Sequence, residues 1–271
     1  MTIHSIETPA QANLALAHAL AQARFDNKQL TTLSPEWDLR SEAQAIQTMF
    51  AVDKRLNWPR LGWKIAATNP ALQKQLRTEH PVFGITYQRD LMTSPATVPF
   101  ETLLDPIIEC EFAFKLAQDL PSRSTKYSPK EVVQAIEAVY PCIEIAQCRF
   151  HHKHLPSPWH IMADGFAAGQ YVIGQSIQNW QDVLENGVTV SLYRDQKLAA
   201  QGHSNDVMGH PLNPVVWLAN HLSKLGKQLS AGDLISSGSC NILSRGRPND
   251  DLEVRYEGLE TLILRLPDSS S

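Results

Sequence analysis

The spacing of apolar residues predicts helices at the start of the chain. Residues 10–25 are rich in Ala and Leu. Residues 34–56 begin with Ser34 as the expected N-cap and Pro35 at the first helical position, which is the order typical of a helix start. The first quarter of the chain is therefore predicted to be helical.

Beyond Trp58 the pattern changes to that of strands and turns. Short apolar runs are separated by Pro, Gly, Asn and Asp, as in β-strands joined by turns. We therefore predict a helical N-terminal region over residues 1–60 and a β-rich domain over residues 61–271. The apolar runs are GWKIAA, FGITY, IIECEFAFKL, CIEIA, QYVIG and VTVSLY.

Two helices are predicted among these strands. In the first, Ser128 and Glu131 have the spacing of a capping box and Pro141 follows the expected end. In the second, Asn213 is the expected N-cap and Gly226 the expected stop. The last apolar runs, LEVRYEGLETLILRL, predict a hairpin.

The run IIECEFAF carries two glutamates inside an apolar strand. Side chains alternate along a strand, so Glu109 and Glu111 lie on one face and Cys110 on the other. Buried anions this close need a metal ion or basic residues between them. A third acid, Glu144 in CIEIA, lies in a strand that could run beside the first.

Carboxylate oxygens are hard ligands, and a cluster of three suits Mg²⁺, Mn²⁺ or Ca²⁺ better than Zn²⁺ or copper. Such a site leaves metal positions free for a chelating substrate. The alternative is that Glu109 and Glu111 occupy the solvent face of an edge strand, with Lys115 nearby.

Composition limits the possible partners. The chain has 271 residues, of which 43% are hydrophobic and 19% charged, as in ordinary globular proteins. Its net charge of -4 comes from acids and bases mixed along the sequence, so neither nucleic acid nor an anionic membrane is expected as a partner. A small molecule is the expected partner.

The four cysteines show no CxxC pair, which favours a reducing compartment. No leader sequence and no apolar stretch of roughly 20 residues is found. We therefore expect a cytoplasmic protein.

Several motifs together resemble those of a known family, the hydratase and decarboxylase branch of the fumarylacetoacetate hydrolase superfamily. The resemblance runs from about residue 10 to the C-terminus, with the motifs in the same order. The matching stretches are GWKIAATNPALQKQL (62–76), PVFGITY (81–87), IIECEFAFKLAQDLP (107–121), PCIEIAQCR (141–149), ADGFAAG (163–169), GHPLNPVVWLA (209–219) and AGDLISSGS (231–239).

The resemblance implies an α+β fold, a mixed β-roll with a helical N-terminal region, in which residues 61–271 form the catalytic domain. It implies Mg²⁺ or Mn²⁺ held at the positions of the three glutamates. It also implies that Lys64 faces the metal and helps with proton transfer or substrate binding, and that Ser237 and Gly238 hold the carboxylate end of the substrate.

The activity implied is that of a metal-dependent hydratase, which adds water to a 2-hydroxy-dienoate or 2-oxo-enoate such as 2-keto-4-pentenoate. The alternatives are a 4-oxalocrotonate-type decarboxylase, an acylpyruvate hydrolase, or a metal-binding subunit that has lost catalysis. The expected partners are a small 2-oxo acid and further subunits, in a homo-oligomer or with a related decarboxylase or hydratase, because such enzymes associate in this family.

Some positions depart from the family pattern. Gln147 and Cys148 stand where the family usually has Asp and Ser, and His160 stands where it has Asp. Asp90 is either a catalytic acid or a solvated turn residue, and Asp164 either binds substrate or water or anchors its turn.

Four histidines cluster between residues 151 and 160. Their irregular spacing suggests a loop that could close over the active site more than a second metal site. They are His151, His152, His154 and His160.

Overall fold

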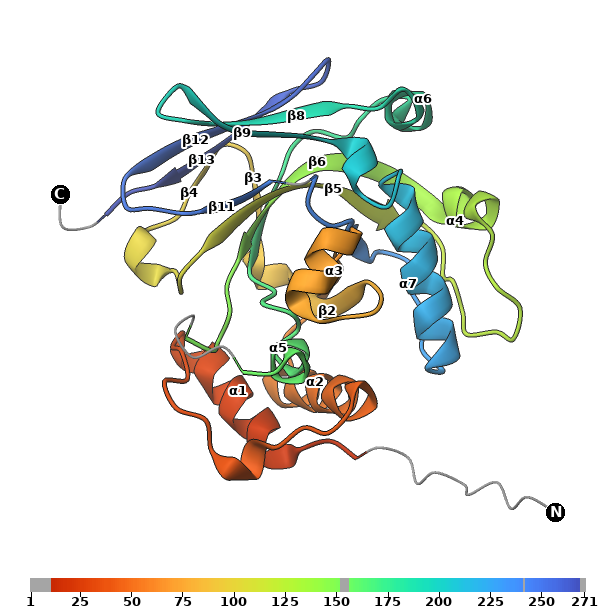
Figure 1. Ribbon diagram of the computed structural model, residues 1–271. Coiled ribbons are helices and arrows are strands. Elements are labelled where there is room, and N and C mark those ends of the chain that lie inside the picture. Colours follow the sequence, from red (N-terminus) through yellow and green to blue (C-terminus); the bar gives the residue numbers. More distant parts are fainter. Residues whose placement is uncertain (1–10, 152–155, 241, 269–271) are drawn as a thin grey trace.

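The computed structural model describes residues 11–151, 156–240 and 242–268, and it confirms the predicted α+β fold (Figure 1). Two sheets combine parallel and antiparallel pairs, so the predicted mixed β-roll is present. Helices gather at the N-terminal end and beside the first sheet. The helices are α1 (Leu14–Asp26), α2 (Glu42–Leu56), α3 (Pro70–Leu76), α4 (Pro129–Ala135), α5 (Pro158–Ala163), α6 (Trp180–Asn186) and α7 (Leu212–Lys224).

The first sheet has the order β2-β1-β10-β5-β6-β7-β3, with β11 also paired to β5. The second has the order β4-β13-β12-β8-β9. The strands of the first sheet are β1 (Arg60–Ala66), β2 (Val82–Tyr87), β3 (Leu91–Thr93), β5 (Ile107–Leu116), β6 (Ile136–Ala146), β7 (Gln170–Ile173), β10 (Leu234–Ser236) and β11 (Leu243–Arg245). Those of the second are β4 (Ala96–Thr97), β8 (Thr189–Arg194), β9 (Lys197–His203), β12 (Asp250–Tyr256) and β13 (Thr261–Leu266).

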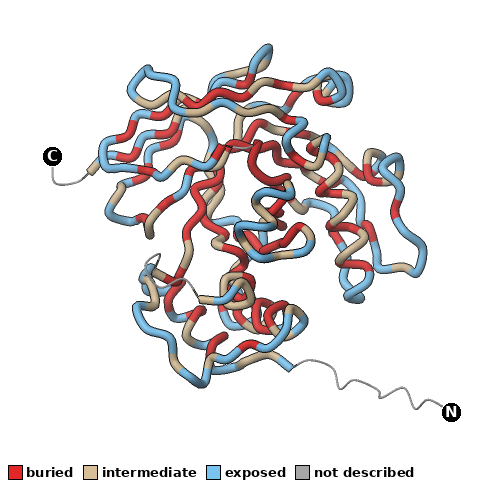
Figure 2. Tube along the Cα trace, in the orientation of Figure 1, coloured by how far each residue is buried: buried red, intermediate tan, exposed pale blue. Residues whose placement is uncertain are grey.

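The long strand β5 has a different environment on each face. One face carries Cys110 and Phe112, which are fully buried in the main hydrophobic core. Phe112 meets Tyr256 of the second sheet edge to face, with ring centroids 5.4 Å apart. Because side chains alternate, Glu109 and Glu111 project away from this core. Figure 2 shows buried residues concentrated along the strands and exposed residues at the outer turns.

The N-terminal helices differ in detail from the prediction. The second helix starts at Glu42, capped by Ser41, and only a single 3₁₀ turn follows Ser34. The Asn13 side chain donates hydrogen bonds to the carbonyls of Glu36 and Asp38, which a continuous helix would need for itself. The predicted start at Ser34 is therefore wrong.

The helix predicted to run from Ser128 to Pro141 is correct at its start and wrong at its end. The capping box of Ser128 and Glu131 is present, but α4 ends at Ala135 and β6 follows at once. Residues 136–146 pair along almost the whole of β5, with Pro141 opposite Phe112. Pairing with β5 therefore overrides the local helix signal.

The fourth predicted helix, the one expected after Asn213, and the C-terminal hairpin are confirmed. Helix α7 begins at Leu212, one residue before the expected cap, because the Asn213 side chain donates instead to the carbonyl of Met208. Strands β12 and β13 form the C-terminal hairpin. No helix in the described parts of the chain is long and apolar enough to cross a membrane.

The helical region is joined to the β-rich part by a buried ion pair. Arg24 of α1 donates to the Asp164 carboxylate at 2.9 Å, and both side chains are nearly inaccessible. Burial alone would lower the pKa of Arg24, but the charges of Asp164, Tyr87 and Asp90, together with the hydrogen bond to Asp164, raise that pKa. Helix α5, which immediately precedes Asp164, packs on α2. The division at residue 60 stays a prediction.

Replacing Arg24 by Ala should lower the free energy of unfolding by about 3–5 kcal/mol, because it leaves Asp164 buried without its ion pair. Urea unfolding followed by circular dichroism measures the change. The matched control is Arg40→Ala, since the Arg40 side chain is 86% exposed beside Asp38 and should change stability by less than about 0.5 kcal/mol. Equal losses in the two variants would show that the buried pair does not secure the helical region.

Candidate metal centre

The three glutamates meet on neighbouring strands. Strand β6 lies antiparallel to β5 with Glu144 directly opposite Glu109, which confirms the predicted neighbourhood of these two strands. One carboxylate oxygen from each of Glu109, Glu111 and Glu144 lies within 4.8 Å of the other two. Glu111 and Glu144 are fully buried in the interior of the sheet. The edge-strand alternative is therefore wrong.

Each of the two fully buried carboxylates is held by one oxygen only. Glu111 Oε2 accepts a hydrogen bond from the Gly238 backbone N–H at 3.0 Å. Glu144 Oε1 accepts one from Lys64 Nζ and one from the Tyr171 hydroxyl, each at 2.9 Å. The remaining oxygens, Glu111 Oε1 and Glu144 Oε2, have no hydrogen-bond partner among the described residues. Buried anionic oxygens of this kind require a positive partner.

Lys64 lies on β1 and is buried against the cluster. Its Nζ is 4.0 Å from Glu109 Oε2 and donates to the Phe166 carbonyl at 3.1 Å. Burial by itself would lower the pKa of Lys64, but the charges of Glu144, Glu109 and Glu111 raise it above its usual value. These charges therefore favour the protonated, cationic form of Lys64.

The glutamate cluster favours protonation. Burial raises the pKa of Glu109 to about 7, a rise that the charge of Glu144 increases and that of Lys64 limits. Burial and the charges of Glu144 and Glu109 raise the pKa of Glu111 well above its usual range. One ammonium group does not neutralise three carboxylates, so the cluster holds protons or a further cation.

Gly238 closes one side of the site. Its φ of +97° belongs to the region that favours glycine, and a Cβ there would lie 2.6 Å from the Thr68 side chain. The hydroxyls of Ser237 and Thr68 are buried and have no hydrogen-bond partner among the described residues. These hydroxyls can therefore bind polar atoms of a ligand.

Tyr171 and Thr68 were not found by the sequence reasoning. Tyr171 reaches Glu144 because β7 pairs with β6 so that these two residues stand opposite each other. The sequence marks QYVIG only as a strand, and register is not visible in it. Thr68 lies inside the GWKIAAT motif, two residues after the end of β1, and that position was the only available signal.

Asp90 and Asp164 lie in a different charged group. The charges acting on Asp90 within the described chain are those of Arg149, Arg24 and Arg89, and burial raises its pKa above its usual value. Asp164 Oδ1 is paired with Arg24, and Oδ2 accepts the Arg149 backbone N–H at 2.8 Å. These contacts favour the turn-anchoring alternative for Asp164. Catalysis by Asp90 and substrate binding by Asp164 stay predictions.

The histidine segment is only partly described. His160 contacts the Ser157 hydroxyl through Nδ1 at 2.8 Å and the Trp37 carbonyl through Nε2 at 2.9 Å. It therefore ties α5 to the segment between α1 and α2. His152 and His154 lie outside the described residues. Closure of this loop over the site stays a prediction.

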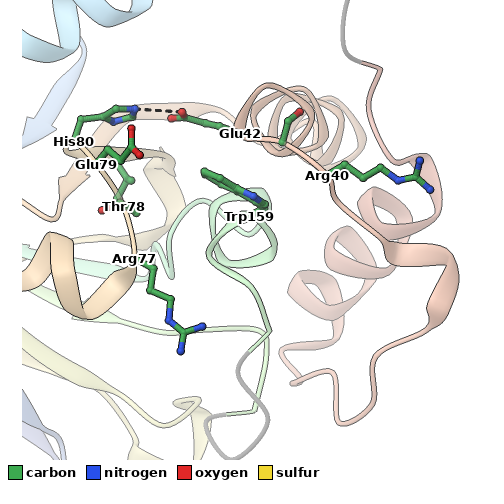
Figure 3. A pocket seen from close by; sticks show the side chains of 9 residues that line it. Arg40, Glu42, Arg77, Thr78, Glu79, His80 and Trp159 are labelled. Carbon is green, nitrogen blue, oxygen red and sulfur yellow. Dashed lines mark hydrogen bonds and ion pairs between the residues drawn. The ribbon is translucent and has the colours of Figure 1, made fainter.

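A separate cleft of about 390 Å³ lies where the start of α2 faces the α3–β2 loop and Trp159 of α5 (Figure 3). His80 Nε2 and Glu42 Oε2, which both belong to residues lining it, lie within hydrogen-bond distance at 3.2 Å. The side chains of Arg40 and Arg77 extend away from Trp159. None of the three clustered glutamates lines this cleft, so it is distinct from the carboxylate site.

Comparison with known proteins identifies relatives along nearly the whole chain, although no family model matches. The chain is 31% identical over 262 residues to a 2-keto-4-pentenoate hydratase of Paraburkholderia xenovorans (strain LB400), covering 93% of both chains. It is 24% identical over 255 residues to a 4-oxalocrotonate decarboxylase of Pseudomonas putida, covering 93% of this chain and 96% of the other.

Solved structures show the same fold. The 4-oxalocrotonate decarboxylase from Pseudomonas putida G7, complexed with magnesium and adipate, superposes with a TM-score of 0.86 at 23% identity, over 94% of this chain and 97% of that one. A fumarylpyruvate hydrolase from Pseudomonas aeruginosa, in complex with Mn²⁺ and pyruvate, gives 0.58 at 14% identity, over 78% and 91%. The chain therefore belongs to the family of the 2-keto-4-pentenoate hydratases, and it shares its fold with 4-oxalocrotonate decarboxylase and with a protein described as a putative fumarylacetoacetate hydrolase family protein from Yersinia pestis CO92.

Proposed function

We propose that this protein is a divalent-metal-dependent lyase that adds water to a 2-hydroxy-dienoate or 2-oxo-enoate such as 2-keto-4-pentenoate. The observation that carries the proposal is the buried cluster of three carboxylates around Lys64, in a chain 31% identical to a 2-keto-4-pentenoate hydratase. The cofactor proposed is Mg²⁺ or Mn²⁺, because all three clustered side chains offer hard oxygen ligands.

The cluster fits such an ion. Glu109, Glu111 through Oε1 and Glu144 through Oε2 would hold it, since the last two oxygens are buried and have no other partner among the described residues. When bound, a divalent cation supplies positive charge that polarises the C2 oxygen and stabilises the enolate of a chelating 2-oxo acid.

Lys64 balances the charge of the site. Three carboxylates, one divalent cation and one ammonium group are together neutral, so an anionic substrate meets no net negative charge. The raised pKa of Lys64 favours its protonated form, so Lys64 acts as a cation that can donate a hydrogen bond to the substrate carboxylate, and not as a resting base. Asp90 remains the proposed proton-transfer group.

The closed end of the site suits the substrate carboxylate. The Ser237 hydroxyl, which has no hydrogen-bond partner among the described residues, can donate a hydrogen bond to it, and Gly238 would contact it from the same turn. Hydration then requires a proton at C5 of the dienolate, followed by addition of the water hydroxyl at C4 and of its proton at C3. The burial of Glu111 and Glu144 keeps bulk water away from these steps.

A 4-oxalocrotonate-type decarboxylase is the second candidate, because that enzyme gives the TM-score of 0.86. The same site would stabilise the enolate left when CO₂ departs. We expect incubation with 2-hydroxypenta-2,4-dienoate and Mg²⁺ to give a product heavier by one water in mass spectrometry. Release of CO₂ from 4-oxalocrotonate without hydration of the dienoate would contradict the hydratase assignment in favour of the decarboxylase.

Replacing Glu111 by Gln should abolish Mg²⁺ binding in isothermal titration calorimetry, because an amide oxygen cannot neutralise the cation. The metal-free variant should be more stable to heat than the metal-free wild type, since the raised pKa of Glu111 means that its negative charge is unfavourable in the fold. The control is Glu137→Gln, because Glu137 is an exposed partner of Lys115. Unchanged Mg²⁺ affinity in the Glu111 variant would disprove the ligand assignment.

Metal binding should depend on pH. Glu109, with a pKa raised to about 7, must lose its proton to bind a cation, so Mg²⁺ affinity should fall by up to about tenfold per pH unit as the pH decreases from about 8 to about 6. Titration in buffers of different ionisation enthalpy should detect the proton released. Equal affinity at both pH values, with no proton release, would contradict this prediction.

The same pKa shift sets a stability trend for the metal-free protein. The folded-state pKa of Glu109 lies above its usual value of 4.5. The contribution of Glu109 to stability is therefore complete below about pH 4.5 and is lost as the pH rises through about 7.

We also propose that the chain forms a homo-oligomer, or associates with a related decarboxylase or hydratase subunit, in the cytoplasm. Two exposed apolar side chains on the neighbouring strands β5 and β11, Ile107 and Leu243, support a contact surface there. Light scattering after size-exclusion chromatography, for the protein alone and mixed with such a subunit, would test this.

A further inference from the structure

We propose that Tyr171 is a positioning residue for the metal site, which holds Glu144 so that its Oε2 atom points to the metal. This inference rests on the proposed metal-dependent function. It concerns a residue on β7, outside the motifs that carry the candidate ligands and Lys64.

The first argument is the direct contact. The Tyr171 hydroxyl donates to Glu144 Oε1 at 2.9 Å, and Tyr171 is only 2% exposed. Its ring belongs to a small buried cluster with Ala113, Cys142 and Leu234 on the face of the sheet that carries the glutamates. Packing of the ring therefore fixes the Tyr171 hydroxyl in position to donate to Glu144.

The second argument is the division of roles between the two oxygens of Glu144. Oε1 accepts from both Tyr171 and Lys64, while Oε2 is buried with no partner among the described residues. Two donors on one oxygen fix the plane of the carboxylate. Oε2 is thereby held in one direction and stays available to a metal ion, which is what a pre-organised ligand requires.

The third argument is that Lys64 is not sufficient for this task. Lys64 is a flexible side chain whose Nζ also contacts the Phe166 carbonyl and lies 4.0 Å from Glu109. An ammonium group also repels a metal cation. A neutral hydroxyl on a rigid ring orients Glu144 and adds no positive charge, so the affinity for the cation is preserved.

The test is isothermal titration of Mg²⁺ and Mn²⁺ into wild type and Tyr171→Phe, which retains the ring and loses the hydroxyl. We expect affinity to fall by about 10- to 100-fold, as for other groups that orient metal ligands. Activity should be recovered largely at saturating metal, because the loss lies in metal binding. Tyr171→Met, which also lacks the hydroxyl but fills the space differently, should show the same fall if Tyr171→Phe does not fold.

Tyr127→Phe is the matched control. Its hydroxyl donates to the Pro121 carbonyl at 2.6 Å, and Tyr127 is also buried, so the variant removes a similar hydrogen bond away from the glutamates. Metal affinity in this control should stay within about twofold of wild type, while a purely structural role for Tyr171 would give similar effects in both variants.

The outcomes separate the inference from the proposed function. If wild type binds neither cation, the proposed function fails. If wild type binds metal and a folded Tyr171→Phe or Tyr171→Met variant binds it equally well, only the positioning role of Tyr171 is overturned.

Discussion

The burial of three carboxylates in the interior of a sheet is the constraint on which the rest of the structure depends. Glu111 and Glu144 are fully buried, and two of their oxygens have no partner among the described residues. A fold tolerates a buried carboxylate of this kind only where hydrogen-bond donors hold it in place and a cation balances its charge. Lys64, Gly238 and Tyr171 provide those donors from three other places in the first sheet or at its end.

The second sheet stabilises the strands that carry these acids. The Tyr256 hydroxyl of β12 lies 2.9 Å from the carbonyl oxygen of Glu111 and 2.7 Å from that of Cys142, either of which can accept its proton, and it accepts the Cys142 backbone N–H at 3.2 Å. One side chain of the second sheet therefore fixes the backbones of β5 and β6 together, directly behind the glutamates. This contact explains how a cluster of like charges can keep its geometry while the opposite face of β5 forms ordinary apolar core.

Two groups of buried charges in the described chain have different roles. The carboxylate cluster has an excess of acids and needs a cation. The group around Arg24, Arg149, Asp90 and Asp164 combines bases and acids, and its buried ion pair joins α1 to the turn after α5. Burial, and after it the charge of the neighbouring Arg24, lower the pKa of Arg149 to about 10.

The sequence by itself determined the elements and the ligand types. Alternation along IIECEFAF placed Glu109 and Glu111 on one face, and the capping box fixed the start of α4, because both signals act between residues close in the chain. Sequence motifs also sufficed to recognise the relationship to the 2-keto-4-pentenoate hydratases. None of these signals depends on which segments meet in space.

The tertiary structure alone decided what depends on pairing between distant segments. It ended α4 at Ala135, since β6 gains more by pairing with β5 than by remaining helical. It brought Tyr171 to Glu144 through strand register, and it engaged Asp164 with Arg24, 140 residues away in the chain. A register shift of one residue between β6 and β7 would turn Tyr171 away from Glu144, and no local pattern encodes that choice.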